Sequence, residues 1–300
     1  MSDKLFQSAD LKAVRTAVAD CVKRNGWLAV VGPVGAGKTT STRAALAAMP
    51  GVRVVEPISL DRERTRIGHV LEACIDDLSE DERPRQSMEA CSRQWRRLVG
   101  EASARERIVL LVEEAHRLHR STLIAIKALR EVGWAGRCPL VSVVLVGQVD
   151  LESRLRRVRE VRLRVKRHTM QGLTQAEVGA YLKWLGVGVA DAAAKQIALR
   201  AREPLAVEDL AARAREWADA HKHRQVTVED VRAALGTDLN IGGRLRESGL
   251  TMTQVARRAG CSKSAVSAVV AGAYAGKPQV AEGIAAVLDE AEAEGKRRVG

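Results

Sequence analysis

Gly32-Pro33-Val34-Gly35-Ala36-Gly37-Lys38-Thr39-Thr40 decides the fold, because this stretch matches the phosphate-binding loop pattern G-x-x-x-x-G-K-[ST] in full. The apolar run 27–31 before it predicts a buried strand, and residues 41–49 after it continue with a helical pattern. Glycines let a backbone wrap closely around phosphate oxygens, and the amides at the start of a helix favour an anion. All nine residues are therefore predicted to bind a nucleoside triphosphate.

Two side chains of the loop have specific predicted roles. Lys38 is expected to reach the β- and γ-phosphates, and Thr39 is expected to ligate Mg²⁺ through its hydroxyl. ATP and Mg²⁺ are thus the predicted cofactors. The alternative is a glycine-rich turn that binds nothing, but the order strand, loop and helix is the context that this motif requires.

A second strand ends in two carboxylates. Residues 108–112 (Ile-Val-Leu-Leu-Val) form an apolar run without alternation, as expected of a parallel strand covered on both faces, and Glu113 and Glu114 follow directly. This is the pattern of a Walker B strand, in which Glu113 would hold Mg²⁺ and Glu114 would polarise the attacking water. The commoner pair is Asp-Glu, so Glu113 departs from it by one methylene. Because His116 and His119 lack an H-E-x-x-H arrangement, we expect both on a helix surface and not on a metal.

Composition bounds the class of protein. The chain has 300 residues with 46% hydrophobic content, which suggests two or three domains, and its formal net charge is +12. Residues 154–167 carry eight basic side chains against one acidic, so nucleic acid and nucleotide are the natural partners. A basic face that is merely solvated is the alternative. Aromatic residues make up only 3%, which favours contacts with a nucleic-acid backbone over base stacking.

Cysteine spacing and hydropathy predict the compartment. The five cysteines are odd in number and far apart, with no C-x-x-C, so neither a disulfide framework nor a zinc site is supported. No early apolar segment follows a basic one, and no run of about 18 apolar residues occurs. We therefore expect no membrane span and a cytoplasmic location, in a bacterial host.

The order of patterns along the chain predicts an α/β fold with a parallel sheet, a helical lid and a small all-α domain. Strands and helices alternate as far as Leu173, and after it the strands stop. Thr174 and Glu177 form a capping box that begins a helical segment. The predicted helices are 10–23, 66–78, 84–102, 121–132, 190–201, 206–221 and one from 227; the predicted domains are 1–172, 173–236 and 240–295, with a linker at 236–240.

These elements together resemble the AAA+ ATPase superfamily over residues 1 to about 236. The resemblance implies that Gln148, which ends the strand Val-Leu-Val-Gly147-Gln148, is the sensor 1 residue that helps to position the water or the γ-phosphate. The sequence Leu-Val-Gly-Gln-Val-Asp-Leu most resembles the branch that contains transposon target selectors and secretion-associated ATPases of the ExeA type. A Pro-Arg pair is common in the lid of that branch, but here Pro204 is followed by Leu205, so the sensor 2 arginine is missing.

The same resemblance implies a site between subunits, completed by an arginine of the neighbour that precedes the last strand of the sheet. Spacing favours Arg162 or Arg164, with Arg159 behind them, and does not choose between them. The other basic residues of the run 154–167 are candidates for following a DNA backbone through a ring or helix of subunits. Three further candidates for this contact follow the second strand: Arg62, Arg64 and Arg66.

Residues 249–267 resemble a helix-turn-helix of the λ-repressor type. Thr251 with Gln254 makes a capping box for the first helix, Gly260 makes the turn, and Ser262 caps the second helix. The alternative is a helical hairpin that contacts only protein. In the helix-turn-helix interpretation, Val255, Ala256, Val266 and Val269 pack inward, and the residues facing a DNA major groove are Lys263, Ser264 and Ser267.

The continuation 269–277, with Gly272-Ala-Tyr274-Ala-Gly276, resembles the small domain of the transposon target-selector family that includes phage Mu transposition protein B. In that protein the small domain precedes the ATPase, whereas here it follows. The resemblance implies an AAA+ ATPase that oligomerises with ATP, as a ring or a helical filament, on double-stranded target DNA and delivers it to a cognate transposase, which it stimulates. A helicase loader, a secretion-associated ATPase and an ATP-binding transcriptional repressor remain the alternatives.

Overall fold

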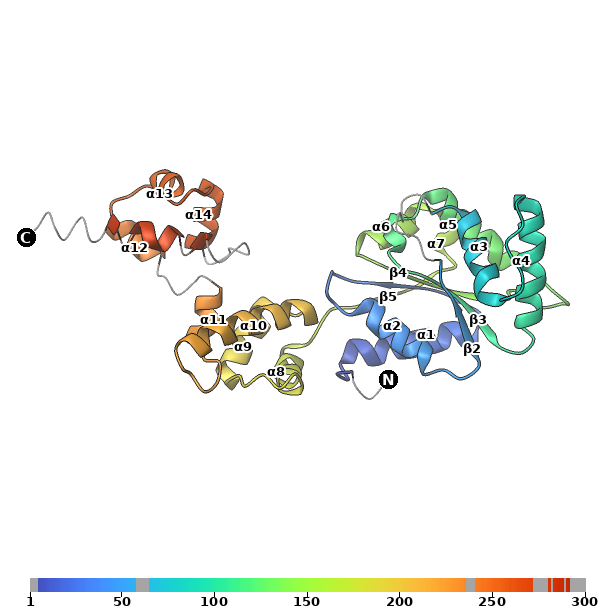
Figure 1. Cartoon of the computed structure of the whole chain (residues 1–300), viewed down its shortest axis with the longest axis horizontal. Helices are drawn as coiled ribbons and strands as arrows, with labels where there is room; N and C mark the ends of the chain where they lie inside the picture. Colours follow the sequence, from blue (N-terminus) through green and yellow to red (C-terminus); the bar gives the residue numbers. More distant parts are fainter. Residues whose placement is uncertain are drawn as a thin grey trace, which may run out of the picture. The chain divides into compact units, whose positions relative to one another are not determined.

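The computed structural model describes residues 5–57, 65–235, 241–271, 280–281, 283–288 and 290–291. The chain divides into two compact units, Met1–Leu173 and Thr174–Gly300 (Figure 1). The further division of the second unit into a lid and a tail domain, with a linker at 236–240, stays a prediction. Among the described residues, no helix is both long enough and apolar enough to cross a membrane.

The first unit is built on a five-stranded parallel sheet with the strand order β2-β3-β4-β1-β5. In the register, Val31 lies opposite Gly147, and Val112 lies opposite Leu145. The carboxyl ends of β1, β4 and β3 are therefore neighbours at one edge of the sheet, where the loop, Gln148 and the two glutamates follow. The strands are β1 (Trp27–Val31), β2 (Val52–Val55), β3 (Arg107–Val112), β4 (Val141–Gly147) and β5 (Lys166–Thr169).

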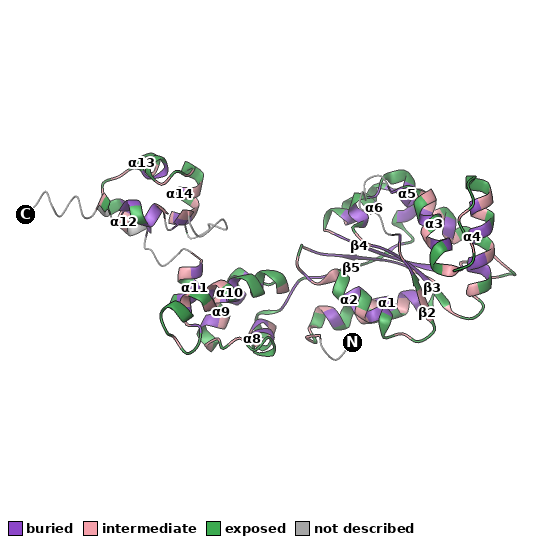
Figure 2. Ribbon diagram, in the orientation of Figure 1, coloured by how far each residue is buried: buried purple, intermediate pink, exposed green. Residues whose placement is uncertain are grey.

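Helices cover both faces of this sheet, which is why its central strands are apolar throughout (Figures 1 and 2). Leu28 and Val30 of β1 pack with α1 and α2, while the alternate residues Trp27, Ala29 and Val31 pack into the core on the opposite face. The helices on that face are α3 (Ile67–Leu78), α4 (Met88–Ala102), α5 (Arg120–Glu131), α6 (Asp150–Arg157) and α7 (Arg159–Arg162); those on the first face are α1 (Ala9–Lys23) and α2 (Lys38–Ala47).

Several boundaries differ from the sequence prediction for local reasons. Helix α4 begins at Met88 and not at 84, because the Ser87 hydroxyl accepts from the N–H of Ala90 and caps it there. The run 154–167, predicted only as a basic segment, forms α6, α7 and part of β5. Strand β5 reads Lys-Arg-His-Thr, so it has no apolar pattern, and it takes its extended form by pairing with β1 at the edge of the sheet.

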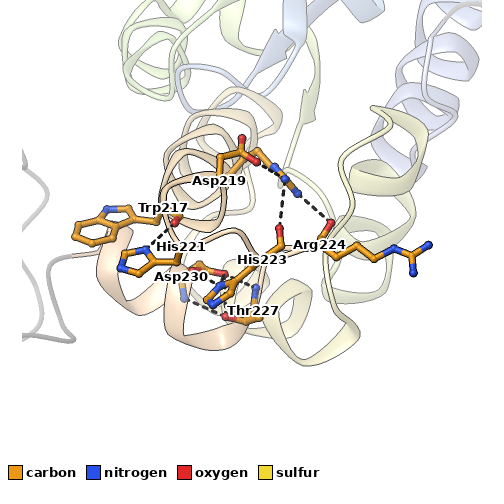
Figure 3. A network of polar contacts seen from close by, with 8 residues as sticks. Trp217, Asp219, His221, His223, Arg224, Thr227 and Asp230 are labelled. Carbon is orange, nitrogen blue, oxygen red and sulfur yellow. Dashed lines mark hydrogen bonds and ion pairs between the residues drawn. The ribbon is translucent and has the colours of Figure 1, made fainter.

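The second unit begins with four helices. These are α8 (Gln175–Trp184), α9 (Asp191–Arg200), α10 (Pro204–Ala220) and α11 (Val228–Ala234). The predicted capping box of Thr174 and Glu177 is present at α8. At α11, buried Asp230 accepts from the N–H and the hydroxyl of Thr227 and lies 3.0 Å from His223 Nδ1 (Figure 3). Burial acts to raise the pKa of Asp230, but the hydrogen bonds from Thr227 and His223 outweigh it and hold that pKa below its ordinary value.

The remaining described helices have a core of their own. They are α12 (Ile241–Glu247), α13 (Met252–Arg258) and α14 (Lys263–Val270). Thr251 with Gln254 caps α13, Gly260 has φ +64°, and Ser262 caps α14, as the sequence predicts. The predicted inward residues, Val255, Ala256, Val266 and Val269, are buried in one cluster with Ile241, Leu245 and residues between 281 and 288.

Candidate nucleotide-binding and catalytic site

The loop between β1 and α2 has the backbone that its glycines predict. Gly35 and Gly37 have φ values of +78° and +81°, in the region that favours glycine. A Cβ added at Gly32 would lie 3.1 Å from the Met170 carbonyl oxygen, so a side chain there would collide with the chain that follows β5. The loop is therefore a bare backbone turn, open to a ligand at the carboxyl edge of the sheet.

The start of α2 provides donors for an anion. Its N-cap residue, Gly37, offers no side-chain acceptor, so the amides of the first turn have no cap. The Lys38 ammonium curls back over the loop and donates to the carbonyls of Gly32 at 3.0 Å and Pro33 at 2.7 Å. Burial lowers the pKa of Lys38, which the charge of Glu114 partly offsets. A cation poised over uncapped amides is an arrangement suited to phosphate.

Glu113 at the end of β3 is held by an arginine that the sequence analysis missed. Arg43 Nε lies 3.0 Å from Glu113 Oε1, and Arg43 Nη2 lies 2.7 Å from Glu56 Oε1, just beyond β2. Hydrogen bonding to Glu113, aided by the charge of both carboxylates, raises the pKa of Arg43. Arg43 is four residues beyond Thr39, so the two share one face of α2. That face is consequently the one that meets Glu113.

Glu114 has an unusual backbone conformation and two basic neighbours. Its φ of +50° places a non-glycine residue in the left-handed region, a strain of about 1–3 kcal/mol that clusters at functional sites. Its carboxylate oxygen Oε2 lies 3.6 Å from His116 Nε2 and 3.6 Å from Arg117 Nε. The turn is followed at once by a 3₁₀-helix, η3 (Ala115–Arg117), and not by the α-helix that the spacing of the histidines suggested.

The expectation that His116 lies on a helix surface is wrong. His116 is 7% exposed, and its Nδ1 accepts from the backbone N–H of Gln148 at 3.4 Å. The burial follows from the tight turn at Glu114, which directs the ring toward the end of β4. His119 does lie at a helix end, as the N-cap of α5, where its Nδ1 accepts from the N–H of Ser121.

These residues fit ATP and Mg²⁺. The bare loop, the uncapped helix and Lys38 match triphosphate oxygens, and the Thr39 hydroxyl and the Glu113 carboxylate are the hard oxygen ligands that Mg²⁺ prefers. Glu113 would exchange its contact with Arg43 for one with the cation. Among the described residues, no group of three or more His, Cys, Asp or Glu side chains could hold a metal ion.

Comparison with known proteins agrees with this geometry. Residues 22–155 match the sequence family described as an AAA domain. Structures similar to this chain include Drosophila ORC bound to DNA, with a TM-score of 0.55 and 17% identity over 94% of this chain and 79% of that one. Cdc6p from Pyrobaculum aerophilum has a TM-score of 0.53 and 15% identity over 94% and 85% of the two chains. The protein is an ATPase with the AAA+ P-loop fold.

A third similar structure is the Aeropyrum pernix ORC1 protein in complex with DNA, with a TM-score of 0.52 and 17% identity over 96% of this chain and 84% of that one. No curated protein matches the sequence of this chain. At these identities the similar structures establish the fold and no more.

The arginines predicted to reach a neighbouring subunit differ in their contacts. Arg164 donates to the Glu160 carbonyl at 2.7 Å and pairs with Glu131 at 3.4 Å. Arg162 and Arg159 are exposed, and within the described part of the chain neither has an ion-pair partner, nor does Arg157. The structure thus leaves Arg162 available and engages Arg164 internally.

Where the resemblance predicts a sensor 2 arginine, the structure has an exposed leucine. Pro204 is at the first turn of α10, where its fixed φ suits a helix start, and Leu205 beside it is 59% exposed. An exposed leucine cannot donate to a phosphate, so the chain has an apolar side chain where the resemblance implies a cation.

The predicted DNA-contacting residues are only partly described. Arg66, at the N-cap of α3, is exposed, whereas Arg62 and Arg64 lie outside the described residues. Lys263, Ser264 and Ser267 are exposed on α14. The segment with Tyr274 that carries the resemblance to the target-selector family lies outside the described residues too.

Proposed function

We propose that this ATPase binds ATP with Mg²⁺, assembles on double-stranded DNA as a helical filament, and delivers that DNA to a partner transposase, which it stimulates. The observation that carries the proposal is the union in one chain of an AAA+ nucleotide site with the capped helix pair α13–α14, whose exposed Lys263, Ser264 and Ser267 suit a DNA groove. The family of phage Mu transposition protein B, which the sequence resembles, has the same two modules.

In this proposal each residue of the site has a defined part. Bound ATP with Mg²⁺ supplies the phosphoryl group that is transferred to water. Lys38 and the amides at the start of α2 bind the phosphates, Thr39 and Glu113 ligate the cation, and Glu114 polarises the attacking water. Gln148 orients that water or the γ-phosphate.

DNA binding is supported by charge and exposure. The net charge of +12 favours a polyanionic partner, and the exposed arginines Arg157, Arg159 and Arg162 have no carboxylate in the described residues to neutralise them. Two of the similar structures, those of the Aeropyrum pernix ORC1 protein and Drosophila ORC, are complexes with DNA. We infer that backbone phosphates neutralise part of this excess.

The exposure of Arg162 supports nucleotide-dependent assembly. It is the arginine we propose to complete the nucleotide site of a neighbouring subunit, and the adjacent Leu163 is 85% exposed, as suits a contact with a second copy. Because such an arginine would contact ATP and not ADP, nucleotide would shift the equilibrium between assembled and free protein. Hydrolysis would then release the DNA.

The test is filament formation on long duplex DNA, observed by electron microscopy with ATP and Mg²⁺. Lys38→Ala should abolish filaments, because it removes the charge that meets the phosphates. Glu114→Gln should bind ATP, turn over slowly and form filaments that outlast those of the wild type after dilution into ATP-free buffer. Arg93→Ala is the matched control, since it removes only a surface pair with Glu89. Normal filaments of Lys38→Ala would refute ATP-dependent assembly.

Delivery is tested by strand transfer with a candidate partner transposase and a duplex target DNA. Wild-type protein with ATP should stimulate transfer into the DNA that it coats, and Lys38→Ala should not. Single-stranded DNA loading without duplex filaments would favour a helicase loader. Tight binding to one palindrome, independent of ATP, would favour a transcriptional repressor, and ATPase activity with no DNA binding would favour the secretion-associated class.

A further inference from the structure

His116 connects two parts of the nucleotide site that are far apart in the sequence. The residue belongs to η3, after β3, and its Nδ1 accepts from the backbone N–H of Gln148, after β4, at 3.4 Å. On the other side of the ring, Nε2 lies 3.6 Å from Oε2 of Glu114. A single buried ring therefore lies between the sensor strand and the carboxylate proposed to act on water.

The hydrogen bond to Gln148 fixes where the ring carries its proton. A backbone N–H can only donate, so Nδ1 must present its lone pair, and a neutral imidazole then has its proton on Nε2. That N–H is on the side of Glu114. The geometry accordingly makes His116 a donor toward the carboxylate and an acceptor from the strand end.

Packing keeps the ring in this place. A Cβ at Gly147, the last residue of β4, would lie 3.2 Å from the backbone nitrogen of His116 and 2.8 Å from Leu151 Cδ2. The strand end can approach η3 this closely only because residue 147 is glycine. Glu114 in turn is held in its left-handed conformation at φ +50°, so neither side of the ring has much freedom.

We propose that His116 is a positioning residue for hydrolysis: it orients the Glu114 carboxylate and ties that orientation to the end of β4, where Gln148 lies. The 3.6 Å separation is longer than a direct hydrogen bond, and contacts of this kind shorten when substrate binds. A shift of Gln148 on contact with nucleotide would be passed to Glu114 through the ring. The proposal rests on the catalytic role of Glu114 and not on DNA delivery.

Two amide variants separate the two contacts of the ring. The side-chain amide of Asn falls near the place of Nδ1, and that of Gln reaches toward the place of Nε2. His116→Gln can thus donate to Glu114, whereas His116→Asn can only replace the contact with Gln148. His116→Ala removes both contacts, and His119→Ala is the matched control because, in the described part of the chain, the hydrogen bonds of His119 are to Ser121 at the start of α5.

ATP turnover and ATP affinity are measured on the full chain without DNA, with thermal melting to check folding. We expect His116→Ala to lower kcat about 10- to 100-fold, since a misplacement of about 1 Å costs on the order of 10²-fold, with KM changed less than about 3-fold. His116→Gln should recover most of kcat and His116→Asn little, at similar melting temperatures. His119→Ala should keep wild-type turnover.

A double variant tests whether His116 acts on hydrolysis through Glu114. In single-turnover reactions, adding His116→Ala to Glu114→Gln should cost little beyond Glu114→Gln alone, because the carboxylate that His116 serves is gone. Equal kcat for His116→Gln and His116→Asn would overturn the proposal and leave His116 a packing residue. So would a double variant whose rate is lowered by the product of the fold decreases of His116→Ala and Glu114→Gln. Wild-type turnover by Glu114→Gln would instead refute the role of Glu114.

Discussion

Arg43 is the residue whose removal most directly tests the role of the carboxylates Glu113 and Glu56 at the nucleotide site. Its guanidinium is 51% exposed, but its partners Glu113 and Glu56 are only 16% and 18% exposed. Arg43→Ala removes from both of these largely buried carboxylates the guanidinium that they share. In the protein without nucleotide, this variant should therefore be less stable than the wild type.

The size of the effect follows from exposure. Solvent-exposed pairs contribute about 0.2–1 kcal/mol, and breaking a fully buried pair costs about 3–5 kcal/mol. Two pairs that share one half-exposed, screened guanidinium should together contribute about 1–2 kcal/mol. For a unit of this size about 1 kcal/mol shifts Tm by roughly 2–4 °C, so Arg43→Ala should lower Tm by about 2–8 °C.

Melting is followed by circular dichroism, with and without Mg²⁺ and ADP. Because the cation takes over the neutralisation of Glu113, the gap between Arg43→Ala and wild type should narrow when Mg²⁺ and nucleotide are bound. The Mg²⁺ concentration for half-maximal ATPase activity should fall, since no guanidinium competes for the carboxylate. Arg43→Lys keeps the positive charge but loses the forked guanidinium that can contact both carboxylates. Its Tm should therefore lie between the Tm of Arg43→Ala and that of the wild type.

Arg93→Ala is the control for this series. Arg93 and Glu89 are 74% and 79% exposed and lie on one face of α4, so their loss should change Tm by less than about 1 °C. If Arg43→Ala melts like Arg93→Ala, the network contributes nothing to stability. If the Mg²⁺ requirement does not move, Glu113 is not the magnesium ligand.

Three further outcomes are expected. Burial raises the pKa of the Cys21 and Cys74 thiols to about 12, so at pH 8 a thiol reagent should modify exposed Cys138 rapidly and these two only on unfolding; fast labelling in a variant with Cys138→Ser and Cys261→Ser, which removes both accessible thiols, would contradict their burial. Because Asp230 has a pKa below its ordinary value of 3.8, its contribution to stability is present above that value and lost as pH falls through its folded pKa. Asp230→Asn keeps the contact with Thr227 only in part, so its Tm at pH 7 should be lower than that of the wild type and should fall less on acidification. The same dependence of Tm on pH in the variant and the wild type would refute this. DNA affinity should fall with salt at a log–log slope of about −0.9 per neutralised phosphate, and a slope near zero in a salt titration would exclude backbone contacts as the main mode.

The nucleotide site could be anticipated because its signals are local. The loop needs glycine at fixed positions for its backbone, and a strand covered on both faces must be apolar at every residue, so Gly37 and the run before Glu113 can be recognised from neighbouring letters alone. Capping has the same character, since Thr251 and Gln254 act within one helical turn. Strand β5 carries no such signal, because Lys-Arg-His-Thr becomes a strand only through pairing with β1.

The sequence by itself determined the chemistry of the site: a phosphate-binding turn, a lysine, a hydroxyl and two carboxylates, each in a recognisable order. Only the tertiary structure decided which charges meet. Arg43 could have been noticed four residues after Thr39, but nothing local indicates that it pairs with Glu113, 70 residues away in the chain. His116 is likewise buried against Gln148 because Glu114 turns left-handed and Gly147 lets β4 approach. Pairings between distant residues depend on the assembled sheet, and for that reason the run 154–167 gave no choice among its arginines. In the described chain Arg164 contacts Glu131 and the Glu160 carbonyl, whereas Arg162 has no carboxylate partner, and which of them reaches a neighbouring subunit stays a prediction.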